Sequence, residues 1–187
     1  MAFIMSKITN TRKQNMAKVT GGIYIPHLKN EIVQPALEYL GLGGARAINQ
    51  VTGTFLAEGY AGGFTYLKQL GKGPAVGAMQ MEPFTYNDIW KNFLLTPKRN
   101  HLANLLKNIA GTFNADSAGI PKPNTLTGDV FFAAAMCRIF YLRVPTALPL
   151  ANDASGMAQY HKKYYNTSLG KAVWQENVDR FQQAIDA

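Results

Sequence analysis

One acidic residue stands where an apolar stretch of the chain stops at a glycine. Glu58 follows the apolar approach TGTFLA and is followed directly by Gly59. The apolar spacing of Val51, Phe55 and Leu56 predicts a buried helix that ends here. A carboxylate at the C-terminal end of a helix opposes the helix dipole, so we expect a raised pKa for Glu58. Such a group suits general acid catalysis near neutral pH.

A glycine-flanked Met-Gln follows Glu58 along the chain. The segment Gly77–Met81 reads GAMQM, and Glu82 comes directly after it. We expect a turn whose backbone, together with the side-chain amide of Gln80, can hold an amide group of a ligand. Met79 either packs on a ligand face or lies in the core.

Acid catalysis of this kind fits cleavage of a glycosidic bond. The leaving oxygen needs a proton, and the oxocarbenium-like centre needs stabilisation. Glu58 would supply the proton. A second carboxylate is expected if water attacks directly or a glycosyl-enzyme forms, and Glu82 is the nearest candidate. The alternative for Glu82 is a solvated or turn-forming residue, in which case an N-acetyl group of the substrate can assist.

The surrounding sequence predicts a mainly α (α+β) fold. Helical periodicity precedes and follows a glycine-rich stretch, and short strands and turns fit that stretch better than a helix does. We therefore expect a small β element near Tyr66–Met81, between helices. The expected helices are 31–40, 43–58, 83–95, 98–111, 129–144, 154–166 and 173–185.

Local signals predict how two of these helices begin. Thr85 and Asp88 have the spacing of a capping box, and either Asn152 or Asp153 could cap the helix that follows it. The helix over 129–144 is apolar nearly all round and should be central. It contains the single cysteine, Cys137, for which a core thiol is favoured over a nucleophile.

Metal and cofactor sites are not indicated. The three histidines, His27, His101 and His161, lie far apart in the sequence and show no zinc-type spacing with Cys137. We expect no metal and no cofactor.

The composition predicts one globular domain with a basic N-terminal arm. The 187 residues are 47% hydrophobic and 16% charged, and 19 basic against 11 acidic residues give a net charge of +8. The first acidic residue is Glu31, so we expect an arm over 1–30 and a domain over 31–187. The arm is either a disordered terminus or a segment ordered on a partner. No stretch approaches the roughly 20 apolar residues of a membrane span, and the opening MAFIMSK does not suit a signal peptide.

Three motifs carry a resemblance to a known family. They are Glu58 within LAEGYAGG, the segment Gly77–Met81, and YYN at Tyr164–Asn166. In this order they resemble the lytic transglycosylase and goose-type lysozyme branch of the lysozyme superfamily, in a phage-encoded form. The similarity spans 31–187. Gly59 stands where the family usually has Ser, and Ala78 where it usually has Leu.

The resemblance implies a lysozyme-like domain that cleaves the MurNAc-GlcNAc β-1,4 bond of bacterial peptidoglycan. It implies Glu58 as general acid/base in a single-Glu route, in which the 6-hydroxyl of the muramyl sugar attacks and gives a 1,6-anhydro product. Tyr165 is expected to hydrogen-bond Glu58. The expected substrate-binding residues are Gln80, Met79, Tyr165, Asn166, Glu82 and Tyr66.

The same resemblance sets expectations for partners and location. The protein would be made in the host cytoplasm and act in the cell wall or periplasm, as a virion-associated enzyme or an endolysin. The arm would bind other virion proteins. The alternative is a structural virion or tail component that keeps the lysozyme-like fold with weak or no activity. A nucleic-acid-binding module is a third hypothesis, and only the net charge supports it.

Overall fold

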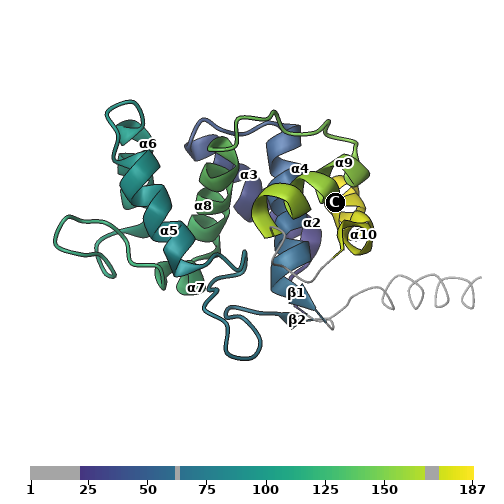
Figure 1. The fold of residues 1–187 in the computed structure, drawn as a ribbon, viewed down its shortest axis with the longest axis horizontal. Helices are drawn as coiled ribbons and strands as arrows, with labels where there is room; N and C mark the ends of the chain where they lie inside the picture. The colour runs from purple at the N-terminus through teal and green to yellow at the C-terminus, as the bar shows by residue number, and fades with distance from the viewer. Residues whose placement is uncertain (1–21, 62–63, 167–172) are drawn as a thin grey trace, which may run out of the picture.

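The computed structural model describes residues 22–61, 64–166 and 173–187. The fold is mainly α, as the sequence predicts, and Figure 1 shows the arrangement of its elements. The first half contains α2 (Ile25–His27), η1 (Leu28–Val33), α3 (Gln34–Tyr39), α4 (Ala45–Thr54), η2 (Phe55–Gly59), β1 (Tyr60–Ala61), β2 (Phe64–Thr65), α5 (Pro83–Ile89) and η3 (Trp90–Leu94). The second half contains α6 (Asn100–Ala110), α7 (Thr125–Gly128), α8 (Val130–Leu142), α9 (Ala154–His161), η4 (Lys162–Asn166), η5 (Trp174–Asn177) and α10 (Val178–Asp186).

Helix α8 is the centre of the core. It packs against α3, α4 and α6, and lies between α6 and α4 in Figure 1. Asp129 begins it, because its side chain accepts a hydrogen bond from the backbone N–H of Phe132 at 2.9 Å. Cys137 is fully buried in this helix, and burial raises the pKa of its thiol. The prediction of a central helix with a core thiol is therefore confirmed.

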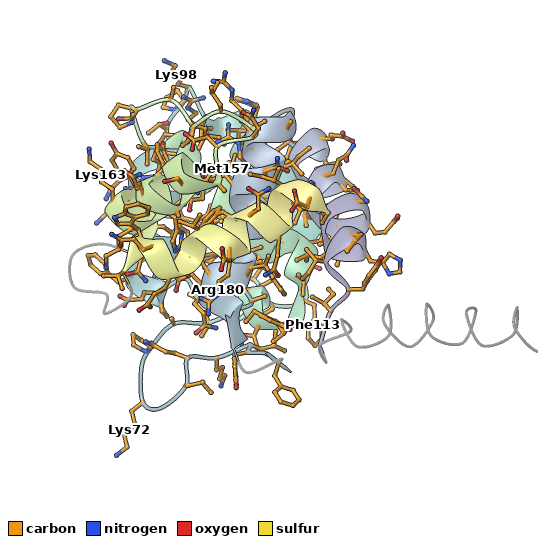
Figure 2. The ribbon with its side chains drawn as sticks, turned by 90° about the vertical axis from the view of Figure 1, so that its right-hand side faces the viewer. Lys72, Lys98, Phe113, Met157, Lys163 and Arg180 are labelled. Carbon is orange, nitrogen blue, oxygen red and sulfur yellow. The ribbon has the colours of Figure 1, made fainter. Side chains whose placement is uncertain are left out.

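The C-terminal helix closes the core behind α4. Helix α10 packs along α4, and the buried Phe181 lies so close to Gly53 that a Cβ there would overlap the ring. Figure 2 shows α10 crossing the face of the molecule with Arg180 on it. Arg180 Nη1 donates to the Ala57 carbonyl at 3.0 Å, next to Glu58. Helix α10, late in the sequence, thereby fixes the turn η2 that continues α4.

A small β element follows the helix that carries Glu58. Strands β1 and β2 are antiparallel, with Tyr60 paired to Thr65 and Ala61 paired to Phe64. Single bridges, Lys68 to Val76 and Val76 to Met81, extend the pairing. The two strands thus precede the expected range, while the bridges fall within it. The small β element between helices is confirmed.

The boundary expected between residues 30 and 31 is wrong, because η1 crosses it. Leu28 is fully buried in the core, and Lys29 Nζ donates to the carbonyls of Ala184 and Ile185 at 2.7 and 3.0 Å. Residues 22–30 therefore belong with the domain. The rest of the expected arm, 1–21, lies outside the described residues.

The expected capping box at Thr85 and Asp88 is also wrong. Glu82 occupies the N-cap of α5 without a side-chain hydrogen bond. Asp88 instead accepts from Arg143 and from Asn92, both at 2.6 Å. At α9 the expectation holds for Asp153, which accepts from the backbone N–H of Gly156 at 2.8 Å.

Candidate active site at Glu58

Glu58 lies at the edge of the core, where α4 ends. The helix continues into the π-helical turn η2, and the chain then enters β1. Phe55 and Leu56 are each 1% exposed and hold this turn against the core. The Glu58 side chain keeps an exposed fraction of 17%, so it remains partly accessible to solvent.

Two residues from the far end of the chain hold this carboxyl group. His161 Nε2 lies 2.8 Å from Glu58 Oε1, and Asn166 Nδ2 donates to the same oxygen at 2.9 Å. Among the described residues, Oε2 has no hydrogen-bond partner. The contacts therefore fix the orientation of the group through one oxygen.

The expectation of a raised pKa for Glu58 is wrong. Burial does raise it, but the hydrogen bond and charge of His161, the hydrogen bond of Asn166 and the charge of Arg180 outweigh burial. The net pKa of Glu58 is lowered. The sequence showed the apolar approach, but not the hydrogen-bond donors that α9 and η4 bring or the charge that α10 brings. At neutral pH the group is a carboxylate, so acid catalysis requires a proton held close by.

His161 is the functional residue that sequence reasoning missed. It is fully buried, its ring stacks on that of Tyr165 at 5.4 Å, and its Nδ1 lies 3.1 Å from Tyr141 Oη. The available signal was the four-residue spacing of Met157, His161 and Tyr165, which puts the imidazole on an apolar helix face. A buried imidazole needs partners on both nitrogens, and here it has them.

Gly59 allows the helix end to touch the GAMQM turn. A Cβ at Gly59 would overlap the carbonyl oxygen of the buried Ala78, and Tyr66 N donates to Gly59 O at 2.7 Å. No side chain fits between these two backbones. This gives a steric reason for Gly at a position where the family resembled usually has Ser.

The turn is held closed by hydrogen bonds. Val76 and Met81 exchange both backbone hydrogen bonds, at 3.0 and 3.1 Å. Gly77 has φ +77°, and Gln80, which is not glycine, has φ +47°. Gln80 Nε2 donates to Gly77 O at 2.7 Å and to Tyr66 O at 3.3 Å. The amide nitrogen of Gln80 therefore stabilises its own turn.

Two of the expected contacts take a different form. Met79 is 1% exposed, so it packs in the core rather than on a ligand face. Tyr165 does not bond Glu58 but donates to the Met79 carbonyl at 2.8 Å. It thereby ties η4 to the turn, while the neighbouring Asn166 reaches Glu58.

The remaining expected ligand residues differ in position. Tyr66 is half-buried and contributes its backbone to the turn contacts. Glu82 is exposed, and no described hydrogen bond or ion pair joins it to Glu58. The structure thus brings together Glu58, Asn166, Tyr165 and the Gln80 turn, and it does not add Glu82 as a second carboxylate.

A pocket of about 370 Å³ lies on the other side of η4. Arg143 and Asp88 form an ion pair at 2.6 Å in its lining, and Phe84 is 81% exposed there. Tyr164 of η4 faces this pocket, while Asn166 of the same turn faces Glu58. The lining residues are Phe84, Thr85, Asp88, Phe140, Arg143, Val144, Pro145 and Tyr164.

Within the described part of the chain, no group of three His, Cys, Asp or Glu side chains could hold a metal ion, and no helix is long and apolar enough to cross a membrane. Comparisons with known proteins found no matching family model, no matching curated protein and no matching solved structure. The case for a function therefore comes from the geometry of the site and the motifs it contains.

Proposed function

We propose that the protein is a phage-encoded glycosidase that cleaves the β-1,4 bond between MurNAc and GlcNAc in bacterial peptidoglycan. One observation carries the proposal: Glu58 presents a carboxyl group at the edge of the core, held through one oxygen by His161 and Asn166. A preorganised acid of this kind is the central requirement of glycoside cleavage.

The single-Glu route fits this arrangement best, because Glu82 is exposed and makes no described contact with Glu58. Glu58 gives a proton to the leaving oxygen as the C1–O bond breaks, and the substrate's N-acetyl oxygen bonds to C1. The Glu58 carboxylate then takes the proton of the C6 hydroxyl, whose oxygen displaces the N-acetyl oxygen from C1. The product is a 1,6-anhydro sugar, and Glu58 is protonated again. No water is consumed.

The glycan has two surfaces to occupy on either side of η4. Next to Glu58 it meets Asn166 and the turn that Gln80 stabilises. Beyond Tyr164, the pocket has the size of a ligand site and the exposed ring of Phe84 on which a sugar can stack. We assign this pocket to a more distant part of the polymer. The enzyme would act in the cell wall or periplasm.

The proposal is tested by mass spectrometry of digested peptidoglycan. The parent chain should release fragments with 1,6-anhydro ends. Glu58→Gln keeps the shape and removes the transferable proton, so turnover should fall by about 10²–10⁴-fold. Glu82→Gln is the matched control and should digest at nearly the parent rate. Equal digestion by Glu58→Gln would refute the assignment of the acid, while reducing ends would show that water attacks instead.

The alternative is a structural virion component. The lowered pKa of Glu58 favours it, since a resting carboxylate carries no proton to donate. A parent chain that digests no peptidoglycan of several wall types, yet copurifies with particles, would support that alternative.

A further inference from the structure

A short chain of buried hydroxyl and amide groups stands behind His161. Tyr141 Oη lies 3.3 Å from Gln50 Nε2, 2.7 Å from Thr54 Oγ1 and 3.1 Å from His161 Nδ1. The amide nitrogen of Gln50 can only donate. A hydroxyl group carries one proton and accepts with its oxygen. Tyr141 can therefore donate either to Thr54 or to His161, and not to both.

Thr54 decides between these two directions. Its Oγ1 lies 2.8 Å from the Gln50 backbone carbonyl, which can only accept. Thr54 thus donates to Gln50, and Tyr141 donates to Thr54. Tyr141 has no proton left for His161, so Nδ1 must carry the proton of that hydrogen bond. This arrangement satisfies all four of the contacts that Gln50, Thr54, Tyr141 and His161 make here, and it leaves only the buried Gln50 Oε1 of this group without a partner among the described residues.

With Nδ1 protonated, only one further proton lies between His161 and Glu58. On Nε2 it gives an imidazolium beside a carboxylate, and on Oε1 it gives a neutral imidazole beside a carboxylic acid. We propose that His161 is a positioning residue that shares this single proton with Glu58 across the 2.8 Å contact, so that the pair, and not Glu58 alone, sets the charge of the site. The proposal deepens the proposed function, and only its activity readout rests on that function.

The other titratable groups near Glu58 and His161 do not compete for the proton that these two residues share. Three acidic side chains lie near the pair: Cys137, Tyr141 and Tyr165. Burial raises the pKa of each, so all three stay neutral at ordinary pH. The charge of Arg180 on α10 favours a negative Glu58. Lys162 Nζ donates to Asn166 Oδ1 at 3.0 Å. None of the three buried acidic groups, the Cys137 thiol and the Tyr141 and Tyr165 hydroxyls, releases a proton in the range where Glu58 does.

The test on the unaltered protein is nitrogen and carbon NMR. Imidazole ¹⁵N signals of His161 and the carboxyl ¹³C signal of Glu58 are followed as the pH changes. We expect Nδ1 to stay protonated throughout the folded range, and Nε2 and the Glu58 carboxyl to report one shared titration. An Nδ1 without a proton, or two independent titrations, would overturn the proposal.

A matched pair of variants tests the same point. His161→Gln can still donate to Glu58 but cannot carry the charge, so the Glu58 midpoint should rise by about 1–3 pH units. His101→Gln, on an exposed face of α6, should leave that midpoint unchanged. An unchanged midpoint in a folded His161→Gln would overturn the proposal, and if that variant does not fold, the measurement on the parent decides.

Activity supplies a further readout. In an active parent, the pH profile of peptidoglycan digestion by His161→Gln should move with the Glu58 midpoint. A profile that stays where the parent's is would overturn the proposal. If the parent cleaves nothing, the proposed function fails, while the NMR result still decides whether the proton is shared.

Discussion

Two contacts between an acidic and a basic side chain differ in their surroundings in this molecule. The Asp88–Arg143 contact is the shorter one at 2.6 Å, against 2.8 Å for Glu58–His161. Its side chains are 31% and 30% exposed, whereas those of Glu58 and His161 are 17% and 0% exposed. Solvent screens the first pair and hardly reaches the second. Burial, and not distance, therefore decides how strongly solvent screens each pair.

The causes of the two pKa shifts show the same contrast. The pKa of Asp88 is lowered mainly by the hydrogen bond from Asn92 one turn away, and then by Arg143. For Glu58 the largest effect, burial, acts in the opposite direction, and contacts with α9, η4 and α10 outweigh it. The pKa of Asp88 therefore depends first on a neighbour one helical turn away, while the pKa of Glu58 depends on the packing of three distant elements.

The largest loss of stability is expected at the contact between Gly59 and the Ala78 carbonyl, beside Glu58. Gly59→Ala places a methyl group on the Ala78 carbonyl oxygen and forces the turn away from the helix end. We expect the free energy of unfolding, measured by urea denaturation, to fall by about 1–3 kcal/mol or more. Gly128→Ala is the control, because a Cβ there meets nothing within 4 Å, and it should be neutral or slightly stabilising. A Gly59→Ala chain as stable as the parent would disprove the close contact.

Acid should weaken the contribution of Glu58 to the stability of the protein. Because its folded pKa lies below the reference value of 4.5, its contribution to stability is complete above about pH 4.5 and is lost as the pH falls through the folded pKa. The stability difference between the parent and Glu58→Gln should therefore shrink on acidification below pH 4.5. Unfolding measured from pH 7 to pH 3 checks this, and a difference that grows in acid would contradict it.

The exposed pair should give the smallest effect. Asp88→Asn removes the charge and keeps the shape, and exposed ion pairs contribute only about 0–1 kcal/mol. We expect a loss within that range that diminishes further in high salt, since salt screens an exposed pair. Urea unfolding at low and high ionic strength is the measurement. A loss of several kcal/mol, or one that salt does not change, would show that this pair resembles Glu58–His161 after all.

Local patterns in the sequence were sufficient for much of the framework. Apolar spacing placed Glu58 at a helix end and predicted the central helix with its buried Cys137. Residue type gave either Asn152 or Asp153 as the cap of α9, and the structure has Asp153 there. Each of these depends on neighbours within a few residues. The mainly α fold with a small β element follows from the same short-range signals.

The chemistry of the site could not be predicted in the same way. The partners of Glu58 lie 103 and 108 residues away, and nothing in the local sequence joins them to it. The direction of its pKa shift was missed because it depends on those partners. Gly59 looked like a departure from a motif until the nearby Ala78 carbonyl showed why a side chain is excluded. Tertiary packing decides each of these points.

The packing of Phe181 against Gly53 affects when the site forms during translation. A ribosome completes α4 and Glu58 long before it reaches α10. The nascent chain therefore first carries this carboxyl group without the helix that packs behind α4. Only when Phe181 reaches Gly53 and Arg180 reaches the Ala57 carbonyl is the helix end fixed. The site therefore becomes complete late in translation, and a chain that stops short of α10 has the acid without the support that orients it.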